Sequence, residues 1–255
     1  MIWRNAARKR LTTMIVAGAA AGLVGAAHAA DEPSDPFEPA NRVFFGFNNV
    51  VDRVVLKPAA RAYRFITPSP VRTGVRNFLG NLGTPVTLTN DVLQGEWARA
   101  GTTVSRFGIN TTIGFFGFLD PAERMGYEPH SEDFNQTLAT YGVPAGPYLY
   151  LPFLGPTTAR GVVGRGVDTV SDPLTWLNHP PGDTVRGVQT GTGVLTGREA
   201  LLDPLDQLER ESIDFYASVR SLYYQTLESQ IANGANDFDN LPDIEFGDDF
   251  DDEDF

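Results

Sequence analysis

Residues 203–228 read DPLDQLERESIDFYASVRSLYYQTLE, and their apolar side chains recur at the spacing of a helix rather than a strand. Asp203 and Pro204 are typical of a helix start, because an acid caps the first turn and proline needs no amide partner there. One face carries Leu205, Leu208, Ser212, Phe215, Tyr216, Val219, Leu222, Tyr223, Thr226 and Leu227. Asn233 and Gly234 supply a stop signal. The stretch predicts one long amphipathic helix whose apolar face packs in the core.

Three further segments show the same helical spacing. We expect a helix from about Ala40 that ends before Lys57-Pro58, with a broad apolar face between residues 43 and 55. A third helix covers about 70–82 and a fourth about 85–94, joined by short loops that contain proline. Short connections favour compact packing of neighbouring helices, so the sequence predicts an all-α fold.

Residues 107–119 are unusually rich in aromatic side chains beside glycine. The segment contains Phe107, Phe115, Phe116 and Phe118, interspersed with three glycines. At about 13 residues it is too short to cross a bilayer of roughly 30 Å, and it suits a buried, re-entrant or interfacial helix. A buried core helix is the ordinary interpretation, and the phenylalanines keep contact with a membrane interface open.

Residues 141–156 read YGVPAGPYLYLPFLGP. Four prolines and three glycines in sixteen residues forbid a continuous helix. We expect an ordered apolar loop or hairpin that lies over the helices. Its ordinary role would be a lid on the core.

The two ends of the chain differ in charge. Residues 1–29 have a basic start, an apolar middle and the small-residue triplet Ala27-His28-Ala29, which is typical of a cleaved secretory signal peptide. A retained membrane anchor is the alternative. Residues 236–255 carry ten acids and no base, so we expect a disordered tail. The helical domain would span residues 30–235. The whole chain has 20 basic and 32 acidic residues, which argues against nucleic-acid binding.

We find no residues in the pattern of an enzyme. The chain has no cysteine, and after signal cleavage only His130 and His179 remain. No Gly-x-Ser-x-Gly elbow, no spaced metal ligands and no complete dinucleotide loop is present. A lone histidine near proline is more often a packing residue than a base. The sequence therefore predicts no catalytic residues, no metal site and no cofactor.

Five segments resemble the MlaA (VacJ) family, and they occur in order along the chain. They are DPFEPANR at 35–42, VRNFLGNL at 75–82, NDVLQG at 90–95, RFGINTTIG at 106–114 and YGVPAGPY at 141–148. The resemblance implies an all-α ring of amphipathic, membrane-interface helices around a central hydrophilic channel, with one Pro/Gly-rich hairpin loop. It also implies residence at the periplasmic face of the outer membrane of a Gram-negative bacterium.

The same resemblance implies a function and partners. Such a protein removes mislocalised phospholipid from the outer leaflet through its channel, passes it to a soluble periplasmic carrier, associates with a trimeric porin and so maintains lipid asymmetry. A periplasmic membrane-associated scaffold or porin-binding protein without transport activity is the alternative, and a lipid-cleaving enzyme is a third, disfavoured one. Family members carry a lipidated cysteine, which this sequence lacks, so apolar helical surfaces would have to hold the protein in the membrane.

The resemblance also assigns two groups of residues. The hairpin would flank and gate the channel through Tyr141, Gly142, Gly146, Pro147, Tyr148 and Pro152. The helix near Ala40 would control access from the leaflet, and together with the 107–119 segment it would contact the membrane, through Phe44, Phe47, Asn48, Asn49, Phe107, Phe115, Phe116 and Phe118.

Overall fold

The computed structural model describes residues 35–176 and 182–233. The expected signal peptide and the expected acidic tail lie outside these residues, as does His179. The elements, in chain order, are α2 (Glu38–Val51), η2 (Asp52–Leu56), α3 (Lys57–Ile66), α4 (Ser69–Gln94), α5 (Trp97–Thr112), α6 (Pro121–Arg124), α7 (Phe134–Thr140), β1 (Tyr148–Leu151), β2 (Gly155–Thr158), α8 (Ala159–Ser171), η3 (Pro173–Trp176), α9 (Gly182–Ala200), α10 (Leu202–Glu211) and α11 (Phe215–Ile231).

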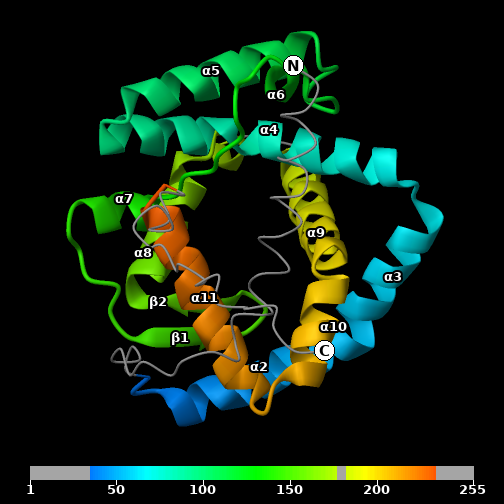
Figure 1. The fold of residues 1–255 in the computed structure, drawn as a ribbon, viewed down its shortest axis with the longest axis vertical. Helices are drawn as coiled ribbons and strands as arrows, with labels where there is room; N and C mark the ends of the chain where they lie inside the picture. The colour runs from blue at the N-terminus through cyan, green and yellow to red at the C-terminus, as the bar shows by residue number, and fades with distance from the viewer. Residues whose placement is uncertain (1–34, 177–181, 234–255) are drawn as a thin grey trace, which may run out of the picture.

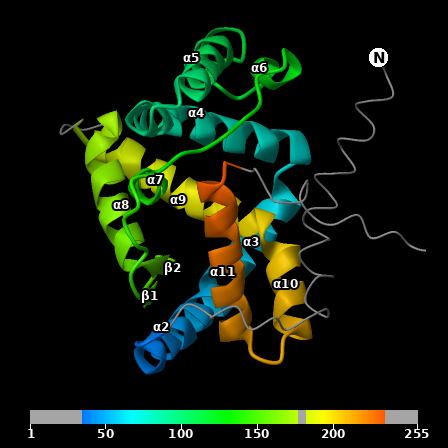
Figure 2. The ribbon, with the colours of Figure 1, turned by 60° about the vertical axis from the view of Figure 1, so that its left-hand side comes forward.

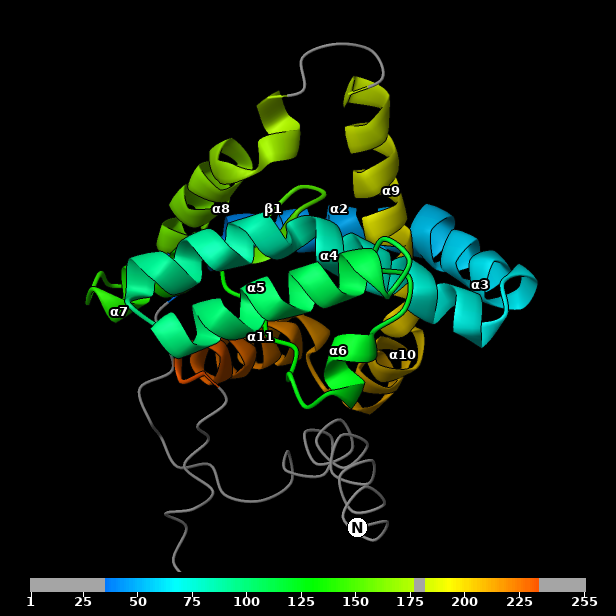
Figure 3. The ribbon, with the colours of Figure 1, turned by 90° about the horizontal axis from the view of Figure 1, so that it is seen from above.

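The helices are arranged as a ring (Figure 1). α2, α3 and α4 follow one another along the rim, while α9 and α10 on one side and α8 and α11 on the other complete the perimeter. Figures 2 and 3 show that α8 and α9 project from one side of the ring, and that α6, α10 and α11 lie on the opposite side. The predicted all-α ring with one hairpin is confirmed.

Two predicted helix ends in the first half of the chain are wrong. The first helix does not end before Pro58: it passes through the five-residue π-helix η2 into α3, where Pro58 occupies the first turn and needs no amide partner. The expected helices 70–82 and 85–94 are one helix, α4, with Pro85 inside it. A proline inside a helix removes one backbone hydrogen bond, and here the helix continues past that loss.

The predicted long C-terminal helix is also wrong, because the chain breaks at residues 212–214. Asp214 adopts an extended conformation, and its Oδ1 accepts the N–H of Ala217 at 3.2 Å, which starts α11. The same carboxylate pairs with Arg42 of α2 at 2.6 Å. A cap and a distant ion pair therefore fix a break that the apolar spacing alone does not reveal.

An aromatic cluster joins α2, the hairpin and α11. Tyr148 and Tyr216 are buried, and the Phe45 ring lies 5.5 Å from the Tyr216 ring and 5.3 Å from the Tyr150 ring. Three pairs of rings in this cluster meet edge to face, the geometry that aromatic quadrupoles favour: Phe45–Tyr150, Phe45–Tyr216 and Tyr148–Tyr216. Burial raises the pKa of the Tyr148 hydroxyl, so this ring stays neutral.

Ion pairs connect the first rim helices to the last ones. They are Arg42–Asp214, Asp52–Arg198, Arg53–Glu209, Lys57–Asp206, Arg61–Asp206 and Arg64–Asp203. Partial burial opposes ionisation of Asp206, but the hydrogen bonds and charges of Lys57 and Arg61 hold its pKa below the ordinary value. The two ends of the described chain are thus held together by charge along one side of the ring.

Glu199 of α9 adds three further ion pairs between the last helices and the first ones. Its side chain is 5% exposed and pairs with Arg64 at 2.9 Å, Arg72 at 3.3 Å and Arg76 at 3.3 Å. Arg64 also donates to the Glu199 carbonyl oxygen at 2.7 Å. Since Arg64 lies on α3 and the other two arginines on α4, one carboxylate joins three helices.

We predict that Glu199→Gln destabilises the fold. The neutral amide leaves three arginines without their common anion, and we expect the free energy of unfolding to fall by about 2 to 3 kcal/mol. Thermal unfolding in detergent measures this loss. The control is Asp203→Asn, whose side chain is 83% exposed and pairs with Arg64 alone, with an expected loss below about 1 kcal/mol. Equal losses in the two variants would contradict the role of Glu199.

Candidate functional site

The outward surface of the ring is unusually apolar. We call the following exposed residues the apolar outer face: Val43, Phe44, Phe47, Val50 and Val54 of α2 and η2, Phe65 and Ile66 of α3, Ile113, Phe115, Phe116 and Leu119 after α5, and Phe153 and Leu154 of the hairpin turn. Phe65 is 91% exposed and Phe115 68%. Soluble monomers rarely expose so many large apolar side chains, so these surfaces favour contact with a membrane or another apolar surface.

α2 has two opposite faces. At 100° per residue, Val43, Phe47 and Val50 lie on the side away from Asn41 and Asn48. The outward side is exposed, and the inward side hydrogen-bonds to the hairpin. Phe44 and Phe47, which the sequence assigned to membrane contact, are 40% and 44% exposed. Phe47 lies on the outward side, whereas Phe44 lies nearer to Asn48, about 40° away around the helix axis. Asn49 is half-buried and makes no side-chain hydrogen bond within the described residues.

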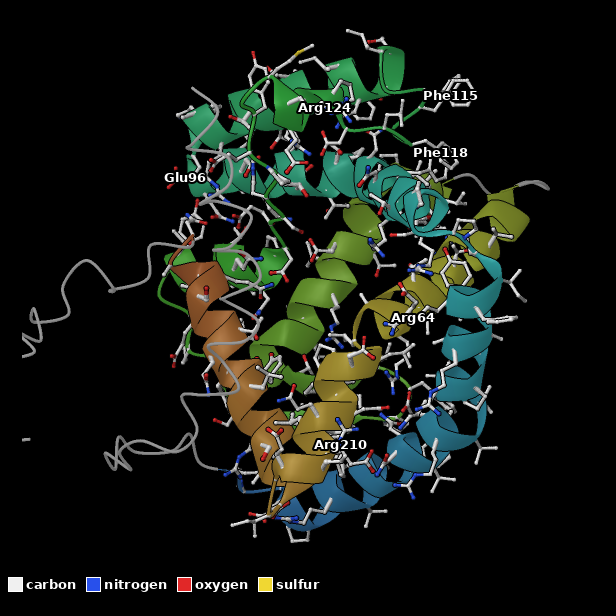
Figure 4. The ribbon with its side chains drawn as sticks, turned by 45° about the vertical axis from the view of Figure 1, so that its right-hand side comes forward. Arg64, Glu96, Phe115, Phe118, Arg124 and Arg210 are labelled. Atoms are coloured by element: carbon white, nitrogen blue, oxygen red, sulfur yellow. The ribbon has the colours of Figure 1, made fainter. Side chains whose placement is uncertain are left out.

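The helix expected at 107–119 is wrong for its second half. α5 ends at Thr112, and residues 113–119 form turns in which Phe115 and Phe116 have φ angles of 54° and 59°. Gly117 has a φ of 92°, and a Cβ there would lie 2.5 Å from the Cβ of Asn81. The tight turn therefore excludes a helix. Figure 4 shows Phe115 at the outer edge of the molecule, and Phe118 stacks on Phe78 with ring centres 4.8 Å apart. Phe107 is partly exposed on α5.

The hairpin lies later in the chain than expected. Its strands pair antiparallel, with Tyr148 opposite Thr158 and Leu151 opposite Gly155, so Pro152 stands in the turn. Tyr141, Gly142, Gly146 and Pro147 belong to the loop before the hairpin. Tyr148, which the sequence placed at a channel edge, is fully buried in the aromatic cluster because its ring packs against α11.

Two asparagines attach the hairpin to α2. Asn41 donates to the carbonyl oxygen of Tyr148 at 3.0 Å and accepts from the N–H of Tyr150 at 2.8 Å. Asn48 repeats the pattern three residues later, donating to the Leu151 carbonyl at 2.9 Å and accepting from the Phe153 N–H at 2.8 Å. Each carboxamide thus pairs with one C=O and one N–H at the edge of the hairpin, as the backbone of a neighbouring strand would.

Other contacts hold the loop before the hairpin. The Tyr141 hydroxyl donates to the Leu93 carbonyl at 2.6 Å, and Arg160 donates to the Val143 carbonyl at 2.6 Å. The N–H of Ala159 donates to the Pro147 carbonyl at 3.1 Å. Burial lowers the pKa of Arg160, whose guanidinium also donates to Asn135 at 2.9 Å. Gly142 and Gly146, with φ angles of 77° and 71°, lie between these attachment points.

The buried interior is mainly polar. Asp91 is fully buried, accepts from Thr103 at 2.5 Å and contacts Nε2 of His130 at 3.1 Å. Buried Glu132 is held by Arg99 and by Gln94, the latter at 3.0 Å. His130 is thus a packing residue joined to the interior, as the sequence suggested. Within residues 35–176 and 182–233 no cluster of acids and histidines has the arrangement of a metal site.

A polar pocket of about 430 Å³ lies between α4, the end of α8, η3 and the start of α9. Asp168, Asp172 and Arg186 are its charged lining residues, and Leu79 and Val86 of α4 form an apolar wall. The pKa of Asp168 is raised above its ordinary value because burial disfavours the charged carboxylate. Hydrogen bonds from the Phe134 N–H and from Asn90 lower this pKa, but they do not offset the effect of burial.

The sequence did not single out Asn41, Arg160 or the residues of this pocket as site residues. Asn41 could have been found, since it precedes Asn48 by seven residues and therefore shares its helix face. Asp168, Asp172 and Arg186 are brought together only by the packing of α8 against α9, for which no local signal exists.

Among the described helices, none combines the length and the apolarity needed to span a bilayer.

Comparison with known proteins agrees with this geometry. The family model described as MlaA lipoprotein matches residues 33–230. The intermembrane phospholipid transport system lipoprotein MlaA of Escherichia coli is 39% identical over 224 residues, covering 83% of this chain and 85% of the relative. The protein of the same name from Haemophilus influenzae is 34% identical, covering 83% and 86%.

A solved structure supports the same conclusion. It is described by the words "Structural basis for maintenance of bacterial outer membrane lipid asymmetry" and shares 34% sequence identity with this chain. The match has a TM-score of 0.69 and covers 78% of this chain and 99% of that one. The family model matches most of the chain, the relatives are more than 30% identical to it, and the fold is shared. This chain therefore belongs to the MlaA lipoprotein family.

Proposed function

We propose that this protein is the outer-membrane component of a phospholipid transport system. It removes mislocalised phospholipid from the outer leaflet through the middle of the ring, passes it to a soluble periplasmic carrier and so maintains lipid asymmetry. The observation that supports the proposal is the distribution of polarity: many large apolar side chains are exposed, and most of the buried side chains are polar. A phospholipid needs this arrangement, because water rejects its tails and hydrocarbon rejects its head.

The apolar outer face would hold the ring in one leaflet, at the periplasmic face of the outer membrane. Burying four phenylalanine side chains offers about 6 to 12 kcal/mol before entropy is counted. The chain contains no cysteine that a lipid could modify, and in this proposal the apolar outer face supplies the attachment. The expected signal peptide, residues 1–29, would direct the chain across the inner membrane, and residues 236–255 would form a separate acidic tail.

The head group would pass between α4, α8 and α9, where the polar pocket lies, while the tails stay beside the membrane-facing side chains. No bond of the lipid is made or broken in this route. Release to a soluble carrier then requires only that the head group bind weakly within the ring, and the exposed polar pocket satisfies this requirement.

The hairpin and its preceding loop would gate the ring. Asn48 joins the hairpin turn to α2, and the Phe47 ring lies 5.2 Å from the Phe153 ring on the outer side. A movement of α2 within the leaflet would therefore move the hairpin. Phe47 would contact lipid on the outward side of α2. Asn48, on the inward side, would pass a shift of α2 to the hairpin through its hydrogen bonds.

The apolar outer face would also receive a trimeric outer-membrane porin. A scaffold that binds a porin without moving lipid would use the same face, so the two functions must be separated by lipid measurements. Deletion of the gene is expected to raise the amount of phospholipid in the outer leaflet, and re-expression to restore the normal amount. Surface labelling of phospholipid measures this, and an unchanged outer leaflet would favour the scaffold.

We predict that Gly142→Ala impairs transport while the fold survives. A side chain at a φ of 77° costs about 1 kcal/mol, and no atom lies within 4 Å of the added methyl group, so the change stiffens the loop without a clash. Outer-leaflet phospholipid is expected to approach the level of the deletion. Gly95→Ala is the matched control, with the same φ of 77° and the same open space but at the end of α4. Equal transport in the two variants would remove the case for gating by this loop.

We predict that replacing Phe115 and Phe116 together by aspartate weakens membrane retention. Both side chains are exposed, so folding should survive, while insertion loses about 3 to 6 kcal/mol of apolar burial. Fractionation followed by carbonate and high-salt washes measures the retained protein. The control is Ile213→Asp, an exposed apolar residue between α10 and α11, outside the apolar outer face. If both proteins stayed in the membrane fraction equally, insertion through the 113–119 turn would be wrong.

A further inference from the structure

The end of α8 carries two acids where a helix least favours them. Asp168 lies in the last turn of α8, and Asp172 follows the helix in an extended conformation, with both side chains lining the pocket. The backbone dipole is negative at this end of a helix, so it does not favour acids there. Neither acid forms an ion pair with any basic residue of the described chain. This part of the pocket is therefore strongly attractive to a cation.

The start of α9 has the opposite arrangement. Arg186 lies in the second turn of the helix, where the dipole is positive and an arginine gains nothing from it. No acid in the part of the chain that the structure describes pairs with Arg186. Arg186 lines the same pocket as the two acids, and this part of the pocket is therefore attractive to an anion.

The pocket keeps these opposite charges apart. Although Asp168, Asp172 and Arg186 line one space of about 430 Å³, no ion pair forms between them. The other described lining residues are neutral: Gln189, Thr169, Thr175 and Thr190 supply polar atoms and Leu79 and Val86 an apolar wall. A ligand that carries both charges on a short link would satisfy both helix ends at once.

We propose that this pocket binds the phosphoethanolamine head group of a phospholipid, with the phosphate at Arg186 and the ammonium at Asp168 and Asp172. This rests on the proposed transport function and names its preferred substrate class. An ethanolamine ammonium has three N–H donors for the two carboxylates. A glycerol head group brings no cation to them, and a choline head group has no N–H to donate.

The surroundings of the pocket suit a lipid rather than a soluble ester. Val170, Trp176 and Val188 are exposed on the same elements, with Trp176 65% exposed. The acyl chains of a lipid could therefore remain against apolar side chains while the head group occupies the pocket.

Asp172 is the more available carboxylate, since it uses one oxygen to accept the Leu174 N–H at 2.9 Å and keeps the other free. The Asp168 carboxylate already accepts hydrogen bonds from Asn90 and from the Phe134 N–H, so it would add a second, weaker contact to the ammonium.

The test uses the purified full chain in nanodiscs of equal parts phosphatidylethanolamine, phosphatidylcholine and phosphatidylglycerol. The lipid that remains bound after mild detergent extraction is identified by mass spectrometry. We expect phosphatidylethanolamine to be enriched about ten-fold over phosphatidylglycerol, the loss of one charged hydrogen bond being of that size. Asp172→Asn should bring the ratio close to that of the nanodisc, because the amide oxygen still accepts the Leu174 N–H but carries no charge. Arg186→Gln should lower the retention of all three lipids.

The control is Glu96→Gln, which makes the same charge change at an exposed acid between α4 and α5 (Figure 4). It should retain the enrichment. Equal ratios in the wild-type chain and Asp172→Asn, or enrichment of phosphatidylglycerol, would overturn the proposal. Displacement of bound lipid by soluble glycerophosphoethanolamine without any lipid preference would assign the pocket to a soluble ester and also overturn it.

A cellular measurement separates this proposal from the function on which it rests. If the wild-type gene restores the outer leaflet of a deletion strain but the nanodiscs show no preference, the pocket assignment fails and transport stands. If the wild-type gene does not restore the outer leaflet, the transport function itself fails.

Discussion

The ring depends on closing a helical chain without a large apolar core. Most large apolar side chains of α2, of the 113–119 turn and of the hairpin turn face outward, so they cannot hold the helices to one another. Charge takes their place: the acids of α9, α10 and the start of α11 meet the basic residues of α2, α3 and α4. Figure 4 shows Arg64 between α3 and the α9–α10 pair, at the point where Glu199 gathers three arginines. Removing such a buried anion costs more than an exposed pair is worth.

A ring closed in this way leaves its two surfaces free to differ in polarity. α2 shows how one helix serves both: its outward side offers valine and phenylalanine, while its inward side offers Asn41 and Asn48 to the hairpin and Phe45 to the aromatic cluster. The hairpin has only two strands, and such a hairpin is marginal alone. Its order comes from the asparagines and from the burial of Tyr148, so the position of the hairpin is tied to the position of α2.

The sequence predicted the helical class and the Pro/Gly-rich loop or hairpin, because each has a local cause: apolar period or proline content. Exposed phenylalanines followed only from the family resemblance, since composition alone favoured a buried core helix at 107–119. The sequence did not predict where helices break or continue. Asp214 ends the expected C-terminal helix through a cap and a pair with Arg42, 172 residues away along the chain. Pro85 fails to end α4, and the glycines after Thr112 end α5 because Asn81 of α4 lies against Gly117. In each case the deciding contact comes from another element, which no local pattern records.

The polar interior also limits what kind of transport the ring can perform. An apolar lumen would bind acyl chains and hold them, since each buried methylene adds about 0.8 kcal/mol. In the proposed route the pocket lined by Asp168, Arg186 and Gln189 would meet a head group through exposed contacts that water also satisfies, while Leu79 and Val86 give it only a small apolar wall. Such contacts are individually weak and quickly exchanged. In the proposed function, selection would therefore act on the head group and leave the tails to the surrounding membrane, which favours passage over storage.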